Sequence, residues 1–214
     1  MSNDIRDMIS SNREYMQGFY ARSVQSVLSS EFGMRITADE LRDFLYNHKS
    51  LVLSYYESTL IEKYYCALQC SVNGIGPVSV EFISTVYKMV YKSRIDAQES
   101  SQSKIFISVI KDLEKAFNRY LSGNSPRFAD RLFVLMRDIE ASRIYCYNLI
   151  GRLVVVRELL QVGYPAVAFR NWYDVALAVR SNDREMFYES LNLMISEECR
   201  VMNECGMKVE VEEL

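Results

Sequence analysis

The side chain best suited to proton-transfer chemistry in this sequence is its only histidine, His48. Histidine is the commonest general acid or base in enzymes, but a di-iron helical bundle needs Glu-x-x-His pairs on two helices and is excluded here. His48 also lies on an apolar stripe of an expected helix, with Leu41, Leu45, Val52 and Tyr55. That placement favours a packed or partly exposed histidine that is hydrogen-bonded to a carbonyl or a neighbouring side chain.

Arg42 precedes His48 by six positions, and Asp43 follows the arginine directly. This RDFLYNH segment resembles the R-x(4–6)-H signature of HEPN-type helical ribonucleases, in which a polar residue often follows the arginine. The resemblance implies that Arg42 and His48 meet across a dimer, where they stabilise a phosphate and activate a ribose 2′-hydroxyl. It gives one enzymatic hypothesis, a helical ribonuclease that uses Arg42 and His48.

Other chemical motifs are missing from the sequence. The phosphate-binding pattern G-x-x-x-x-G-K-[ST], the dinucleotide pattern G-x-G-x-x-G, the zinc pattern H-E-x-x-H and C-x-x-C do not occur. The cysteines are odd in number and scattered, at positions 66, 70, 146, 199 and 205, so we expect reduced thiols in a cytoplasmic, non-secreted protein. We therefore expect no metal site and no cofactor, and we favour a non-enzymatic protein over an enzyme.

Charge is distributed unevenly, although the net charge is only −3. Residues 88–137 hold ten basic and five acidic side chains, whereas residues 183–214 hold three basic and nine acidic ones. The basic segment 104–131 is a candidate nucleic-acid-binding surface, although its spacing favours the solvated face of an amphipathic helix. Its candidate residues are Lys104, Lys111, Lys115, Arg119, Arg127 and Arg131.

The most regular apolar pattern lies in residues 126–162. Its ten positions alternate steps of four and three: Phe128, Leu132, Leu135, Ile139, Ser142, Cys146, Leu149, Leu153, Val156 and Leu160. This spacing predicts one helix of about 55 Å with a coiled-coil-like seam. Such a helix kinks near Gly151, lies in an elongated bundle, or packs its end on another subunit. In the last case Leu149, Leu153, Val156 and Leu160 form the interface.

Glycine and proline total only 11 of 214 residues, which argues against turn-rich β folds. We predict an all-α, elongated bundle of about seven helices, one or two of them longer than 30 residues. The expected helices span 3–32, 37–73, 79–98, 103–123, 126–162, 166–179 and about 184–205, followed by a frayed acidic tail at 207–214. The chain is one domain over 1–214, or two packed subdomains divided by the polar loop 98–103, and it has no membrane-spanning segment.

Arginine outnumbers lysine by 17 to 8, and there are 15 tyrosines. Protein interfaces are enriched in arginine and tyrosine. With the seam and the charge asymmetry, this composition predicts a non-enzymatic interaction or assembly protein that binds a protein partner or itself. A viral structural or host-interaction protein fits that profile. The alternatives are the helical ribonuclease and the nucleic-acid-binding module.

Overall fold

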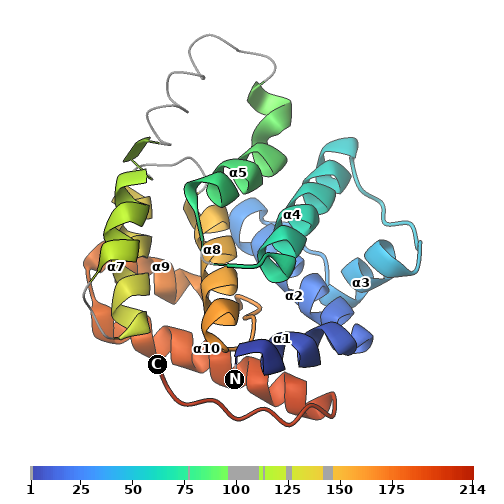
Figure 1. Ribbon diagram of the computed structural model, residues 1–214. Helices are drawn as coiled ribbons and strands as arrows, with labels where there is room; N and C mark the ends of the chain where they lie inside the picture. The colour runs from blue at the N-terminus through green and yellow to red at the C-terminus, as the bar shows by residue number, and fades with distance from the viewer. Residues whose placement is uncertain (1, 77, 96–110, 113, 124–126, 142–146) are drawn as a thin grey trace.

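Helix α8 (Tyr147–Val162) lies at the centre of the fold, and every residue from 149 to 160 is buried. It contacts α1 (Ser2–Ser11), α4 (Tyr55–Asn73), α5 (Val80–Ile95) and α7 (Phe128–Ala141), which surround it in Figure 1. A helix that is enclosed on all sides is expected to be apolar all round. However, α8 also carries Arg152, Arg157 and Glu158, and the surrounding elements must supply partners for these charges.

The computed structural model describes residues 2–76, 78–95, 111–112, 114–123, 127–141 and 147–214. The remaining helices are α2 (Arg13–Phe32), α3 (Ala38–Tyr46), α9 (Trp172–Ser181) and α10 (Arg184–Glu204), and residues 111–112 and 114–122 are also helical. No strand occurs among the described residues, which confirms the all-α prediction. The polar loop 98–103 lies outside them.

The helices are shorter and more numerous than predicted. The longest described helix, α10, has 21 residues and is about 32 Å long. The expectation of about seven helices, with one or two above 30 residues, is therefore wrong. Figure 1 shows short helices grouped around α8 instead of a few long helices arranged along one axis.

The predicted helix 37–73 is two helices. Its start is confirmed, because Thr37 and Glu40 form a reciprocal capping box at the first turn of α3. The helix then ends at Tyr46, and α4 begins after a second capping box, formed by Ser54 and Glu57. This Ser54-Tyr-Tyr-Glu57 pattern is visible in the sequence and is a signal for a helix start. The predicted helix 3–32 divides similarly at Asn12, whose side chain accepts a hydrogen bond from Tyr15 N at 3.0 Å.

The predicted seam helix 126–162 is also two helices, α7 and α8, and residues 142–146 between them lie outside the described residues. The two helices pack against each other, so both present apolar residues to one core and prolong the same spacing across the connection. Gly151 lies within the uninterrupted helix α8. A methyl group at position 151 would lie 2.7 Å from Met136 Cε and 3.0 Å from Trp172 Cζ2. Glycine therefore serves close packing of α8 on α7 and α9.

The segment 207–214 is predicted to be frayed, but it packs along α10, as the dark red coil at the bottom of Figure 1 shows. Met207 and Val209 are buried, whereas Lys208 between them and Glu210 after them are exposed. This alternation explains why the segment packs, because successive side chains of an extended segment point to opposite sides and one side can be buried. No described helix combines the length and the apolar character that crossing a bilayer requires.

We predict that Gly151→Ala lowers the free energy of unfolding by about 1–2 kcal/mol, because overpacking against Trp172 outweighs the better helix propensity of alanine. Gly18→Ala in α2 is the matched control. A methyl group there meets one atom, Arg22 Nη1, at 3.1 Å, so Gly18→Ala should destabilise the protein less than Gly151→Ala. Urea unfolding followed by circular dichroism measures both variants, and equal stabilities would contradict the packing role of Gly151.

Candidate functional site

The buried charges of α8 are the most unusual chemical feature of the core. Arg152 is 1% exposed, and its Nη1 and Nη2 atoms donate to Ser26 Oγ at 3.2 Å and to Ser30 Oγ at 2.8 Å on α2. It also lies 3.6 Å from a carboxylate oxygen of Glu31 and stacks over the rings of Phe169 and Trp172. Burial lowers the pKa of Arg152. This arrangement joins α8 to α2 through one desolvated cation.

Arg157 and Glu158 join α8 to the connection between α4 and α5. Arg157 donates to the carbonyls of Gly76 at 3.1 Å and Ile75 at 2.8 Å. Glu158 accepts the backbone N–H of Val78 at 2.6 Å and the hydroxyl of Tyr120. Burial and the nearby carboxylate raise the pKa of the Tyr120 hydroxyl. Both charged residues therefore hold the backbone of this connection, at Ile75, Gly76 and Val78.

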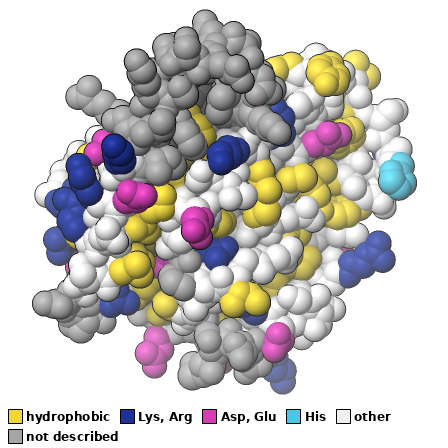
Figure 2. Space-filling view, turned by 45° about the horizontal axis from the view of Figure 1, so that its top comes forward, with side chains coloured by type: hydrophobic (Ala, Val, Ile, Leu, Met, Phe, Trp, Pro, Cys, Tyr) yellow, Lys and Arg dark blue, Asp and Glu magenta, His cyan; other side chains and the backbone are white. Residues whose placement is uncertain are grey.

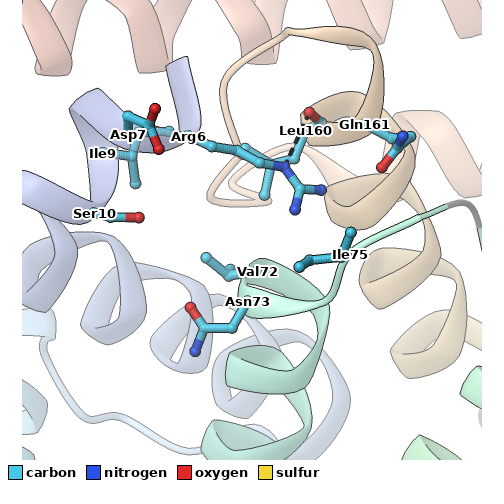
Figure 3. Close-up of a pocket in the computed structure, with 9 residues that line it drawn as sticks. All are labelled: Arg6, Asp7, Ile9, Ser10, Val72, Asn73, Ile75, Leu160 and Gln161. Carbon is cyan, nitrogen blue, oxygen red and sulfur yellow. Dashed lines mark hydrogen bonds between the residues drawn. The ribbon is translucent and has the colours of Figure 1, made fainter. Parts of the chain in front are cut away.

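A hollow of about 480 Å³ lies beside this connection, between α1, the end of α4 and the end of α8 (Figure 3). Arg6 extends from α1 into this region and donates to Leu160 O at 3.3 Å and Gly74 O at 2.6 Å. Burial, and then the neighbouring Arg6, lower the pKa of Arg157. Asp7, Ser10, Asn73 and Gln161 supply the remaining polar groups of the lining.

The hollow lies where two helices end, and an arginine side chain there joins the two ends. The carbonyls at the last turns of α4 and α8 form partial negative charges, and cations near a helix C-terminus are stabilising. Arg6 bonds one carbonyl from each of these two ends through Nε and Nη1, whereas its buried Nη2 has no hydrogen-bond partner among the described residues. Position 74 requires glycine, since a methyl group there would lie 1.7 Å from Arg157 Nη1.

A second buried carboxylate, Glu198 on α10, connects three parts of the chain. Its Oε1 atom accepts the Tyr15 hydroxyl at 2.8 Å and Arg22 Nη2 at 2.5 Å, and its Oε2 atom accepts Ala168 N at 3.3 Å. Burial raises the pKa of Glu198 despite these donors. The Glu198 carboxylate therefore stabilises the packing of α10 on α2 and on the connection before α9, and both of its oxygens are used for this.

The exposed aromatic side chains form the clearest candidate contact surface. We define the aromatic surface as Val52, Tyr55 and Tyr56, with the adjoining His48 and Lys49. Val52 is fully exposed, and Tyr55 and Tyr56 are 88% and 55% exposed. The surface occupies the connection between α3 and α4 and the first turn of α4. Sequence reasoning placed these residues inside one long helix and so missed the surface, although the Ser54–Glu57 capping pattern marks it.

The connection that carries the aromatic surface is held by local hydrogen bonds. The carbonyl of Asp43 accepts the N–H of Asn47 at 2.9 Å and that of Lys49 at 3.3 Å. The Asp43 carboxylate accepts Lys49 Nζ and Asn47 Nδ2, and these bonds lower its pKa. His48 between them has a φ of 53°, a left-handed conformation that is uncommon for a residue with a side chain. The backbone here is therefore fixed in a turn that ends α3.

Arg42 and His48 of the ribonuclease hypothesis lie on different elements. Arg42 is within α3 and lies 3.4 Å from its partner Asp39, whereas His48 follows the helix and is exposed. In Figure 2 the histidine, in cyan, projects at the right-hand edge of the molecule. The expected apolar stripe around His48 is absent because α3 ends at Tyr46. Neither residue lines the hollow beside Arg6.

Some side chains of the basic segment form ion pairs within the chain. Lys115 lies 3.5 Å from Asp112, and Arg119 lies 3.0 Å from Asp138 on α7. Arg131 bonds the Tyr120 hydroxyl, whereas Lys111 and Arg127 are exposed. Lys104 lies outside the described residues. The nucleic-acid-binding role stays a prediction, and at Arg119 it has to compete with an existing pair.

The four predicted interface residues are placed in the core. Leu149, Leu153, Val156 and Leu160 are between 0% and 2% exposed within the single chain. An interface needs exposed side chains, and α8 has none at these positions because neighbouring helices cover it on all sides. Among the described residues, no group of three or more histidine, cysteine, aspartate or glutamate side chains is placed to hold a metal ion.

Comparison with protein-family models, with curated proteins and with solved structures found no match to this chain. Function is therefore inferred from the geometry described above.

Glu198 predicts a specific pH dependence of stability. Because its folded-state pKa is raised above the usual 4.5, the folded protein holds this proton more tightly than the unfolded chain. The free energy of unfolding should therefore fall as the pH rises from 4.5 through the folded-state pKa. Glu198→Gln removes this contribution, so its stability should fall less over that range in urea unfolding at a series of pH values. Parallel pH profiles for the two proteins would contradict the assignment.

His48 predicts a gain in stability on substitution. His48→Gly should raise the free energy of unfolding by about 0.5–1 kcal/mol, because glycine adopts a φ of 53° without steric cost. His48→Ala is the matched control, since it removes the imidazole and keeps the backbone strain. The same two variants address the ribonuclease hypothesis, which requires RNA cleavage by the wild type and its loss in both. A wild type without cleavage activity ends that hypothesis.

Proposed function

We propose that this chain is a non-enzymatic protein-interaction or assembly protein, and that the aromatic surface is its contact site. The observation that carries the proposal is the exposure of Val52, Tyr55 and Tyr56 within five residues. Single apolar residues on a surface are ordinary, but three large exposed ones this close together in the chain favour a contact site. The narrower prediction of a viral structural or host-interaction protein stays a prediction.

The rigidity of the connection supports this proposal. A contact surface binds more tightly when its backbone is already ordered, because binding then costs less conformational entropy. The Asp43 hydrogen bonds and the Ser54–Glu57 capping box order both ends of the connection. Tyrosine also combines a large apolar ring with a hydroxyl, which is why it often dominates binding energy. The partner we propose is a protein surface with an apolar centre and hydrogen-bond acceptors at its edge.

The test is a double substitution on the aromatic surface, Val52→Ser with Tyr55→Ser. Both side chains are exposed, so the free energy of unfolding should change by less than about 0.5 kcal/mol. Purification of the tagged protein from its native source, followed by mass determination, should recover a partner with the wild type and lose it with the variant.

Tyr173→Ser on α9 is the control for that experiment. Tyr173 is 74% exposed and belongs to a helix that does not include the aromatic surface, so its loss should leave the partner bound. Recovery of the same proteins with the wild type and with the double variant would contradict the proposed contact site.

A further inference from the structure

The segment Met207–Leu214 resembles a bound peptide. Its first four residues alternate between buried and exposed, with Met207 and Val209 inward and Lys208 and Glu210 outward. No helix or strand is assigned to it, and it turns back against α10, the helix from which it emerges. Its contacts therefore resemble those between a groove and an extended ligand.

Two asparagines of α10 form hydrogen bonds with the backbone of this segment. The Asn203 side chain donates to Val209 O at 3.3 Å and accepts Val209 N at 3.0 Å. Asn192 accepts the backbone N–H of Leu214 at 2.9 Å. The two asparagines are eleven positions apart, or about three helical turns, so they share one face of α10. We call this face, with Ser196 and Cys199 between them, the α10 stripe.

Open space borders the segment on both sides. A hollow of about 600 Å³ lies between it and α10, lined by Ser196, Cys199 and Asn203 of the α10 stripe. Another, of about 660 Å³, separates it from Ile5 and Met8 of α1 and from the turn at Gly163. The segment is attached through its backbone bonds and through Met207 and Val209, which belong to the hydrophobic core, so an exchanged copy must bury the same two side chains.

The connection between α10 and the segment is a single tight turn at Gly206. The N–H of Gly206 bonds Asn203 O and that of Met207 bonds Met202 O, each at 3.0 Å, and Gly206 has a φ of 80°. If this one residue becomes extended, the segment points away from its own α10 stripe. All its other contacts can then form again on an identical stripe.

We propose that the segment Met207–Leu214 exchanges between two copies of the chain, so that each copy's segment occupies the α10 stripe of the other. A second copy is the occupant that the observations favour, because it carries the sequence already seen in the groove and restores the same Asn203 and Asn192 bonds. Exchange of identical elements is a low-cost route to a dimer, since only the turn changes. This contact is separate from the aromatic surface and does not depend on it.

Gly206→Val tests the exchange. No atom lies within 4 Å of a methyl group at position 206, so the substitution penalises only the left-handed backbone of the closed turn. The exchanged form lets residue 206 become extended and escapes the penalty. In sedimentation velocity, wild-type dimers should increase with concentration, and Gly206→Val should lower the dimer dissociation constant about tenfold or more.

Gly33→Val is the matched control, because Gly33 ends α2 with a φ of 65° and is equally free of neighbours. Gly33→Val should lower the free energy of unfolding without changing the proportion of dimers. An excess of the synthetic peptide MKVEVEEL should convert wild-type dimers to monomers, and a shuffled peptide without the alternation should not. Monomers of wild type and Gly206→Val at every concentration, equal dimerisation by Gly33→Val, or dimers insensitive to the peptide would overturn the proposal.

Failure of this proposal is distinguishable from failure of the proposed function. Exchange should persist in Val52→Ser with Tyr55→Ser, whose segment and α10 stripe are intact. If the synthetic peptide MKVEVEEL binds monomers while Gly206→Val forms no dimers, the stripe accepts an extended peptide without exchange between copies, and the proposal is overturned.

Discussion

The fold depends on the desolvation of three charged residues on its central helix. An uncompensated buried charge costs several kcal/mol, so Arg152, Arg157 and Glu158 require partners from elements that are far apart in sequence. Arg152 bonds serines on α2, Arg157 bonds carbonyls after α4, and Glu158 bonds Val78 and Tyr120. Apolar packing alone would hold these elements against α8, but the directional bonds determine where each one lies.

The sequence predicts local structure well where the chemistry is local. The predicted helix end at residue 32 and helix start at residue 37 are confirmed, because they depend on Gly33 and on the Thr37–Glu40 capping box, which lie next to the helix ends that they set. The seam through α7 and α8 misleads because apolar spacing records burial and not continuity. The aromatic surface was missed for a related reason: Val52 and Tyr55 match the helical spacing, and only the Ser54–Glu57 capping box shows that a new helix begins between them.

The buried charges could not be assigned from the sequence, although Arg157 and Glu158 stand out within an apolar run. Their partners are backbone atoms and single hydroxyls, which carry no sequence signature. The same holds for the α10 stripe, where Asn192 and Asn203 look like ordinary surface residues until Met207–Leu214 is seen against them. Contacts to backbone can be recognised only after the fold is known.

The contact between Gly74 and Arg157 constrains how this chain can diverge. The guanidinium occupies the space that any larger residue at position 74 would need, and it is held there by the carbonyls of residues 75 and 76. Neither position can drift independently, since a side chain at 74 is tolerable only after the arginine has been shortened. In related sequences the two positions should therefore covary, with glycine at the first wherever arginine occupies the second.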